Sequence, residues 1–350
     1  NCCIAGNVIA GPTVAITNAL AGGPSVDANN PFSYDVYNNF LSTNEIENYG
    51  GSAQIDYDLG SMALTSITAY RKVKALTNQD SDFTGADLIG ENSQDLGIDT
   101  FTQELRLTSD FDGPINFLIG GYYFNEKIKQ KNDIRFGTQF RDYGNALIRA
   151  ASGNALNVGL LETTFGALEG NPAKYAGTFF RAGTGLDEAY RMKDEAFSIF
   201  GTVDFEVTDR LTFTLGGNYT KDRKNFSTNV ISTDVFSGIN LNAAAYTPFR
   251  QALLIGQGVP APTAAFLAAN PTLTLPDGRS ANPLAGLRPF QFLPPFLNVP
   301  NAVEDGKTND GDFSYSVRAA YELTDTVNVY ATYATGFKAS SVNLSRDSRP

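Results

Sequence analysis

Strict alternation of apolar and polar residues on both sides of a tight turn is the feature that most constrains this chain. It is clearest from Ala196 to Lys224, in AFSIFGTVDFEVTDRLTFTLGGNYTKDRK. The apolar set of its first arm is Phe197, Ile199, Gly201, Val203 and Phe205. Because successive side chains of a strand point to opposite faces, the two sets lie on opposite faces of a strand. A soluble sandwich makes the same alternation over shorter arms, whereas arms of about ten residues with aromatics near their ends are typical of a transmembrane β-barrel.

The alternation recurs, and it predicts four hairpins. Their arms are 46–59 with 62–75, 98–109 with 115–131, the two halves of 196–224, and 312–323 with 327–337. The arm Met62–Ala75 alternates weakly, so its faces stay unassigned. We therefore expect an all-β fold, an antiparallel up-and-down transmembrane β-barrel that is partial, with about eight strands.

Long connections separate the hairpins, at Leu76–Gly97, Asp133–Arg191 and Ile231–Gly311. Short turns that alternate with long loops are typical of outer-membrane barrels, whose long loops are extracellular and whose short turns are periplasmic. The two longest loops contain stretches with apolar residues near helical spacing, Ala146–Leu168 and Pro248–Leu267, which suit either short helices or ordered coil.

Composition excludes several classes of protein. No stretch of about 18 apolar residues occurs, so a transmembrane helix is excluded. Histidine is absent, which removes catalytic triads and histidine metal sites. The net charge of −11 argues against binding of nucleic acid. The only cysteines, Cys2 and Cys3, are adjacent and suit incidental loop positions better than a redox site. We expect no enzyme, no metal and no cofactor.

Charged residues on the polar strand faces form the first set of candidate site residues. In a barrel this face lines a lumen, so charges there are expected to pack against a plug, and a catalytic carboxylate pair is the less favoured interpretation. The set is Glu104, Arg106, Asp204, Glu206, Arg318 and Glu322. A separate cluster, Asp80, Asp82 and Asp87, suits a solvated loop better than a calcium site, because its spacing is not that of an EF-hand.

Arginine and aromatic residues in the long loops form the second set. Such residues suit planar, anionic or sugar ligands, although packing of the loops against each other is the favoured interpretation. The substrate-binding candidates are Arg149, Phe179, Phe180, Arg181 and Tyr190.

Three blocks resemble one family. They are the hairpin Ala196–Lys224, the segment Thr102–Lys127 (TQELRLTSDFDGPINFLIGGYYFNEK) and the strand Asn328–Ser340 (NVYATYATGFKAS). Their order is similar to that in the barrel of TonB-dependent outer-membrane receptors. The resemblance implies a barrel of about 22 strands filled by an N-terminal plug. The plug, the TonB-binding box and the closing C-terminal strands have no counterpart in this sequence, so residues 1–350 are expected to be part of one β-barrel domain.

The resemblance also implies a function. A receptor of this family takes up a scarce nutrient, such as a ferric siderophore, across the Gram-negative outer membrane, using energy delivered by TonB through the plug. The expected partners are outer-membrane lipid, TonB and a small-molecule ligand such as an iron chelate, with cobalamin, haem and oligosaccharide also open. A passive porin-like or adhesin-like barrel without a plug is the alternative, and an outer-membrane enzyme is a third, less favoured, class.

Overall fold

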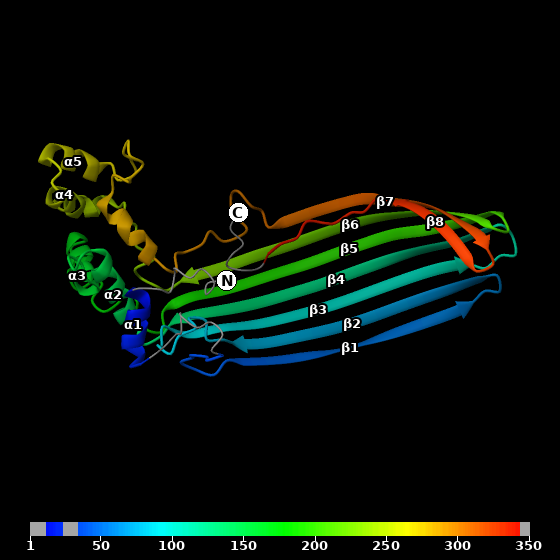
Figure 1. Ribbon diagram of the computed structural model, residues 1–350, viewed down its shortest axis with the longest axis horizontal. Coiled ribbons are helices and arrows are strands. Elements are labelled where there is room, and N and C mark those ends of the chain that lie inside the picture. The colour runs from blue at the N-terminus through cyan, green and yellow to red at the C-terminus, as the bar shows by residue number, and fades with distance from the viewer. Residues whose placement is uncertain (1–11, 24–33, 344–350) are drawn as a thin grey trace.

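One antiparallel sheet dominates the computed structural model, which describes residues 12–23 and 34–343 (Figure 1). Its strand order is β1-β2-β3-β4-β5-β6-β7-β8, so each strand pairs with its neighbours in sequence. The strands are β1 (Thr43–Asp58), β2 (Met62–Asn78), β3 (Ile89–Ser109), β4 (Ile115–Phe136), β5 (Gly185–Thr208), β6 (Leu211–Ser232), β7 (Lys307–Thr324) and β8 (Val327–Ala334). The predicted up-and-down arrangement of a partial barrel is confirmed, with β1 and β8 as edge strands.

The strand register confirms the two faces that the alternation predicts. Residues directly opposite each other in a sheet share a face. Leu215 lies opposite both Val203 and Val317, which defines the apolar face. Thr214 lies opposite both Asp204 and Arg318, which defines the polar face.

The same register resolves the strand whose faces the sequence left open. On β2, Leu64 lies opposite Leu107 of β3 and therefore belongs to the apolar face. Thr65 lies opposite Arg106 and belongs to the polar face.

Large apolar side chains stay exposed on the apolar face, where Ile199 and Leu215 are 58% and 56% exposed. Aromatic residues bound this band at both ends, with Tyr123 opposite Phe197 at one end and Phe205 opposite Phe213 at the other. The eight residue steps between Phe197 and Phe205 span about 27 Å along the strand, or about 21 Å in height at a tilt of about 40°. That height is close to the apolar band of a membrane barrel, about 25 Å.

Most strands extend further than the alternation predicts, and β8 is the exception because it ends at Ala334 instead of Phe337. β3 begins at Ile89 instead of Ile98, and β5 at Gly185 instead of Ala196. β4 and β6 likewise continue to Phe136 and Ser232. Beyond the apolar band the apolar face carries charged residues, so the hydrophobic pattern stops while backbone pairing continues. The true connections are therefore shorter than expected and run through residues 79–88, 137–184 and 233–306.

Helices gather at the end of the sheet opposite the short turns (Figure 1). They are α1 (Pro12–Ala21), α2 (Phe140–Ala151), α3 (Val158–Leu168), α4 (Thr247–Gly256), α5 (Ala261–Ala269) and the 3₁₀ helices η1 (Ala244–Tyr246) and η2 (Pro283–Phe290). Short helices are confirmed, but each predicted stretch holds two. The Asn157 side chain accepts the N–H of Leu160 and so starts α3 afresh. None of the helices in the described residues has the length and apolar character needed to cross a membrane.

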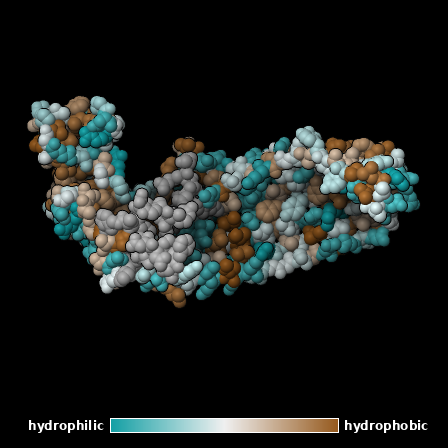
Figure 2. All heavy atoms as spheres, in the orientation of Figure 1, coloured by the Kyte–Doolittle hydropathy of each residue, from teal (hydrophilic) through white to brown (hydrophobic). Residues whose placement is uncertain are grey.

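We call residues 137–184 and 233–306 the loop module. Most of the buried apolar side chains lie in it or in the strand ends beside it. We call the part of the sheet between the short turns and the aromatic row at Phe197 the lower sheet, and its large apolar side chains are exposed. Figure 2 shows apolar patches at the helical end of the molecule and along the sheet, where hydrophilic side chains lie among them.

Candidate functional site

The loop module is built on a cluster of buried aromatic rings. Phe179 and Phe180, both fully buried, lie 4.9 and 5.2 Å from the ring of Phe236. Phe140 stacks on Phe136 at 3.8 Å, which fixes α2 to the end of β4. Such pairs add roughly 0.5–1.5 kcal/mol each to their burial. In this structure Phe179 and Phe180 therefore hold the two long loops together.

A bidentate ion pair fixes the segment that carries these two phenylalanines. Both terminal nitrogens of Arg141 donate to the carboxylate of Glu162, each at 2.8 Å. Glu162 also accepts the backbone N–H groups of Phe179 and Gly177, at 2.8 and 3.1 Å. Burial opposes ionisation of Glu162, but these hydrogen bonds outweigh it and hold the pKa of its carboxyl below the ordinary value. Phe180 adopts a φ of +54°, which is costly for a residue other than glycine.

A second polar cluster joins the two halves of the loop module. Tyr246 stacks on Phe165 at 4.7 Å, and its hydroxyl donates to Glu169. The hydroxyl of Tyr175 donates to the same carboxylate at 2.8 Å, and Lys174 forms a salt bridge with it. Burial and the carboxylate together raise the pKa of Tyr246, so this tyrosine is a permanent hydrogen-bond donor.

Arg250 is a buried cation that the sequence marks only as a loop arginine. It is 1% exposed and donates to the carbonyl oxygens of Ala268, Ala243 and Leu241 at 3.0, 2.9 and 3.2 Å. Burial lowers the pKa of its guanidinium. These contacts tie α4 to α5 and leave Arg250 a structural residue.

The candidate residues of the loops thus divide into two groups. Phe179, Phe180 and Tyr190 are buried, Tyr190 on the upper part of β5. Arg149 and Arg181 are exposed, Arg149 at the end of α2 and Arg181 directly after Phe180. A cavity of about 350 Å³ opens next to Arg181, lined by Ala182, Gly183, Arg135, Phe136, Gly137, Thr138, Asp87, Gly90 and Glu91.

The polar strand candidates are distributed along one face instead of meeting at one point. Glu104 and Arg106 form a salt bridge at 3.0 Å. Asp204 accepts a hydrogen bond from Thr214 at 2.5 Å, and the guanidinium of Arg318 lies 4.8 Å from the ring centre of Tyr330. The two remaining carboxylates, those of Glu206 and Glu322, are exposed near the short turns.

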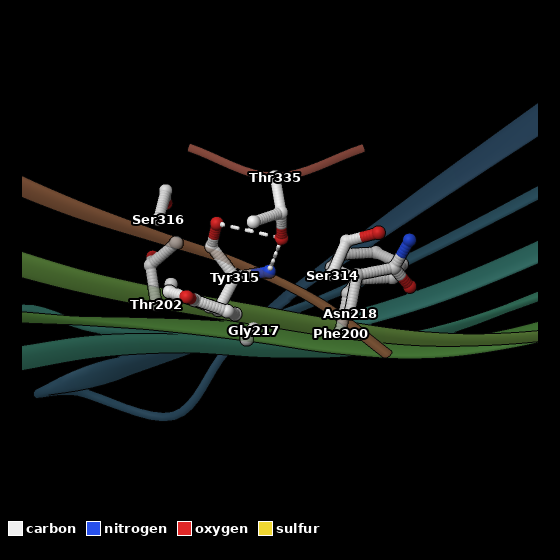
Figure 3. A pocket seen from close by; sticks show the side chains of 10 residues that line it. Phe200, Thr202, Gly217, Asn218, Ser314, Tyr315, Ser316 and Thr335 are labelled. Carbon is white, nitrogen blue, oxygen red and sulfur yellow. Dashed lines mark hydrogen bonds between the residues drawn. The ribbon is translucent and has the colours of Figure 1, made fainter. Parts of the chain in front are cut away.

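A shallow hollow of about 280 Å³ lies on the sheet between β5, β6 and β7 (Figure 3). It exists because Gly216 has no side chain between Thr202 and Ser316, which lie opposite it on either side. A Cβ atom at Gly216 would stand 2.6 Å from the hydroxyl of Ser316. Thr335 closes the hollow through its hydrogen bonds with the backbone of Tyr315. The lining holds only small polar and aromatic side chains, with no charge to drive chemistry.

The aspartates of the loop at 79–88 accept hydrogen bonds from that loop and from the segments packed beside it. Asp82 accepts the backbone N–H groups of Thr84 and Ile89, both within 2.9 Å. Asp87 accepts from the amide of Asn39 and from Thr138. Burial raises the pKa of Asp82. Within residues 12–23 and 34–343, no group of three His, Cys, Asp or Glu side chains is placed to hold a metal ion, and Cys2 and Cys3 lie outside these ranges.

Sequence reasoning missed the partners that hold the loop module together. Glu162 and Phe236 are central to it, yet each is distant in sequence from the residues it contacts. Glu162 pairs with Arg141 across 21 positions, and a lone glutamate in a helical stretch carries no signal of such a partner. Phe236 lies four residues beyond the true end of β6, which the alternation does not reveal.

Comparison with known proteins places this architecture in a family. The family described as TonB dependent receptor-like, beta-barrel matches residues 10–348. No curated protein sequence is detectably similar to the chain. Similar solved structures include the ferric yersiniabactin uptake receptor FyuA from Yersinia pestis, with 12% identity and a TM-score of 0.41 over 83% of this chain and 27% of that one.

Two further structures are similar to the same degree. The siderophore receptor PiuA from Acinetobacter baumannii has 16% identity and a TM-score of 0.40 over 83% of this chain and 32% of its own. The ferric-catecholate import receptor Fiu from E. coli K12, in its open form, has 12% identity and a TM-score of 0.42 over 87% of this chain and 38% of its own. The chain thus spans about a third of each of these receptors. Its exposed apolar face, polar opposite face and matched residues lead to one conclusion: the chain belongs to the family of TonB-dependent receptor β-barrels.

Proposed function

We propose that this chain is part of a receptor in the Gram-negative outer membrane that imports a scarce small molecule with energy from TonB. The observation that carries the proposal is the apolar face, with exposed side chains such as Leu215 in a band about 21 Å high. A protein in water does not leave such a face uncovered, whereas lipid covers it without cost. Residues 1–350 would then be one part of a barrel whose plug contacts TonB.

The loop module is the proposed ligand-capture surface. It stands at the end of the sheet opposite the short turns, which is the extracellular end if the family's orientation holds. The exposed Arg149 and Arg181 are the proposed ligand contacts, because guanidinium groups bind carboxylates and other anions in a defined geometry. The buried Phe179, Phe180 and Tyr190 support this surface. An anionic ligand, such as a ferric siderophore, suits these cations.

Uptake measurements test the proposal. Replacing both Arg149 and Arg181 by Gln in the full-length receptor should weaken ligand uptake at low concentration while barrel assembly stays normal. The variant Arg210→Gln, which alters an exposed arginine at a short turn outside the loop module, is the control.

A passive porin-like barrel is the alternative. It predicts uptake that persists in cells lacking TonB and does not saturate with ligand, and either result would reject energised import.

The orientation in the membrane has its own test, because an impermeant cysteine reagent on intact cells should label a cysteine placed at Arg181 and leave one placed at Asp209 unlabelled. The reverse labelling would invert the topology.

A further inference from the structure

Backbone pairing between β7 and β8 ends well before β7 does. The last regular pair is Ser316 with Ala334, whereas β7 begins at Lys307. Residues 307–315 of β7 therefore pair with β6 on one side, and no described strand pairs with them on the other side. The alternation in the sequence predicts that β8 continues to Phe337, so the sequence favours pairing where the structure shows none.

The segment after β8 nevertheless follows β7 in the same register. We call residues 335–340 the strap. One step beyond the last regular pair, the N–H of Thr335 donates to the carbonyl oxygen of Tyr315 at 2.9 Å. Six steps beyond that pair, the N–H of Ser340 donates to the carboxylate of Asp310 at 2.9 Å. Both contacts join residues that continued pairing would place directly opposite each other.

Side chains hold the strap and the edge of β7 where a backbone ladder is absent. The N–H of Tyr315 donates to the hydroxyl of Thr335 at 3.0 Å, where a ladder would use the carbonyl oxygen (Figure 3). Further along the same edge, the N–H of Phe313 donates to the carboxylate of Asp312 at 2.8 Å. Alternate residues of an antiparallel strand present their N–H groups to the same neighbour. These two N–H groups are therefore the ones that a paired strap would bind.

Continued pairing would bring complementary residues together. It would place Phe337 opposite Phe313, which is 58% exposed and already lies opposite Tyr219 of β6. It would also place Lys338 opposite Asp312, and both of these residues are exposed. Cross-strand aromatic pairs and pairs of opposite charge both stabilise a sheet. Phe337 would fall on the apolar face and Lys338 on the polar face, which is the order that the alternation requires.

We propose that the strap is a switch in the wall of the barrel. In the detached position described here, side chains hold residues 335–340 and the edge of β7 is open. In the paired position, the strap extends β8 along β7 and closes that edge. Thr335 also lines the hollow between β5, β6 and β7 (Figure 3). Its side chain would turn to the apolar face in the paired position, so the hollow opens when the edge closes.

The height of the open edge decides what it faces. The ring of Tyr219 lies 6.4 Å from that of Phe197, between ring centres, so Phe313 beside it lies near the aromatic row that ends the apolar band. The edge continues from there to Lys307, away from the band. The opening therefore faces the membrane interface and the water above it, where water can satisfy unpaired backbone groups. This step rests on the membrane placement argued under the proposed function and not on transport.

Hydrogen exchange of the strap in the purified full-length receptor tests the switch. Thr335→Val removes the hydroxyl that holds the detached position and keeps a β-branched side chain. Exchange of residues 336–340 should then slow about threefold, because the balance moves to the paired position. A strap with only the detached position would exchange faster instead, since it loses a tether, and that result would overturn the proposal.

A charge swap tests the contact that exists only in the paired position. Lys338→Glu should speed exchange of the strap about threefold, because like charges directly opposite each other are destabilising. The double variant Asp312→Lys/Lys338→Glu should return the rate to that of the parent. Lys307→Glu, which alters another exposed lysine of β7 beyond the strap, is the matched control and should have no effect.

Two results would reject the paired position outright. They are an unchanged rate in Lys338→Glu and a charge swap that fails to restore the parent rate. Exchange of residues 327–334 should stay the same in every variant, and a change there equal to that in the strap would also overturn the proposal. An inert strap with normal uptake would remove the switch alone, whereas uptake without TonB would remove the proposed function alone.

Discussion

The lower sheet and the loop module use the same aromatic and aliphatic residues in opposite ways. On the sheet, Phe197 and Ile199 are 43% and 58% exposed, and the rings meet in separate tilted pairs, such as Phe197 with Tyr219. In the loop module, Phe165 and Phe236 are fully buried and contact three and two other rings, respectively. The sheet is held by its backbone ladder and leaves its apolar side chains exposed, whereas the module is held by its side chains. Mutations should therefore act on the two regions through different mechanisms.

The largest effect is expected in the module, from Phe236→Ala. Removal of this ring leaves a cavity beside Phe179 and Phe180, and a buried Phe→Ala change costs about 3–5 kcal/mol. Hydrogen exchange of residues 137–184 in the full-length receptor should speed up strongly, while heat-modifiable gel mobility still reports an assembled barrel. Ile199→Ala on the sheet is the control, with little change expected in either measurement. A comparable loss from both variants would abolish the contrast between the two regions.

The next effect sharpens the contrast between the faces of one strand. Leu215→Arg places a charge in the lipid and should cost about 2–4 kcal/mol near the midplane of the bilayer. Thr214→Arg, one residue away on the polar face, should cost about 1 kcal/mol, mainly from the lost hydrogen bond to Asp204. Folding titrations of the full-length barrel in lipid vesicles measure both costs. Equal costs at the two positions would mean that the faces are assigned wrongly.

The smallest effect is the response of the module to acid. The pKa of Glu162 is lowered in the folded state, so its stabilising contribution is complete above the ordinary value near 4.5. It is lost as the pH falls through the lower, folded pKa. The hydrogen-exchange protection of residues 177–181 should therefore decrease when the pH falls below about 4.5. The local free energy of opening should fall by about 1–3 kcal/mol. Glu162→Gln should lose this protection already at neutral pH and respond little to acid, whereas Glu304→Gln, at an exposed site, should behave as the parent.

Sequence reasoning succeeds for the sheet because the alternation of apolar and polar residues along one strand is enough to predict which side chains face which side. Alternation between Leu211 and Tyr219 fixes both the strand and its faces. It fails beyond the apolar band, where Lys127 and Lys193 replace apolar residues while the ladder continues. In the module the decisive contacts join distant residues, such as Arg141 with Glu162, so composition identified the aromatic loops without revealing which rings are buried. Arg149 and Arg181 remain predicted ligand contacts.

The length of the strands has a consequence for how the receptor meets its surroundings. β5 continues from Phe197 to Gly185, about 12 residues past the aromatic row, which is about 40 Å of chain and about 30 Å of height at a tilt of about 40°. Under the proposed function, the loop module would stand well above the bilayer on a stiff hydrogen-bonded collar. A ligand bound there would still have to travel the depth of that collar before it reached the level of the bilayer. The collar would thus separate recognition from permeation in space, so that binding affinity and transit rate could vary independently.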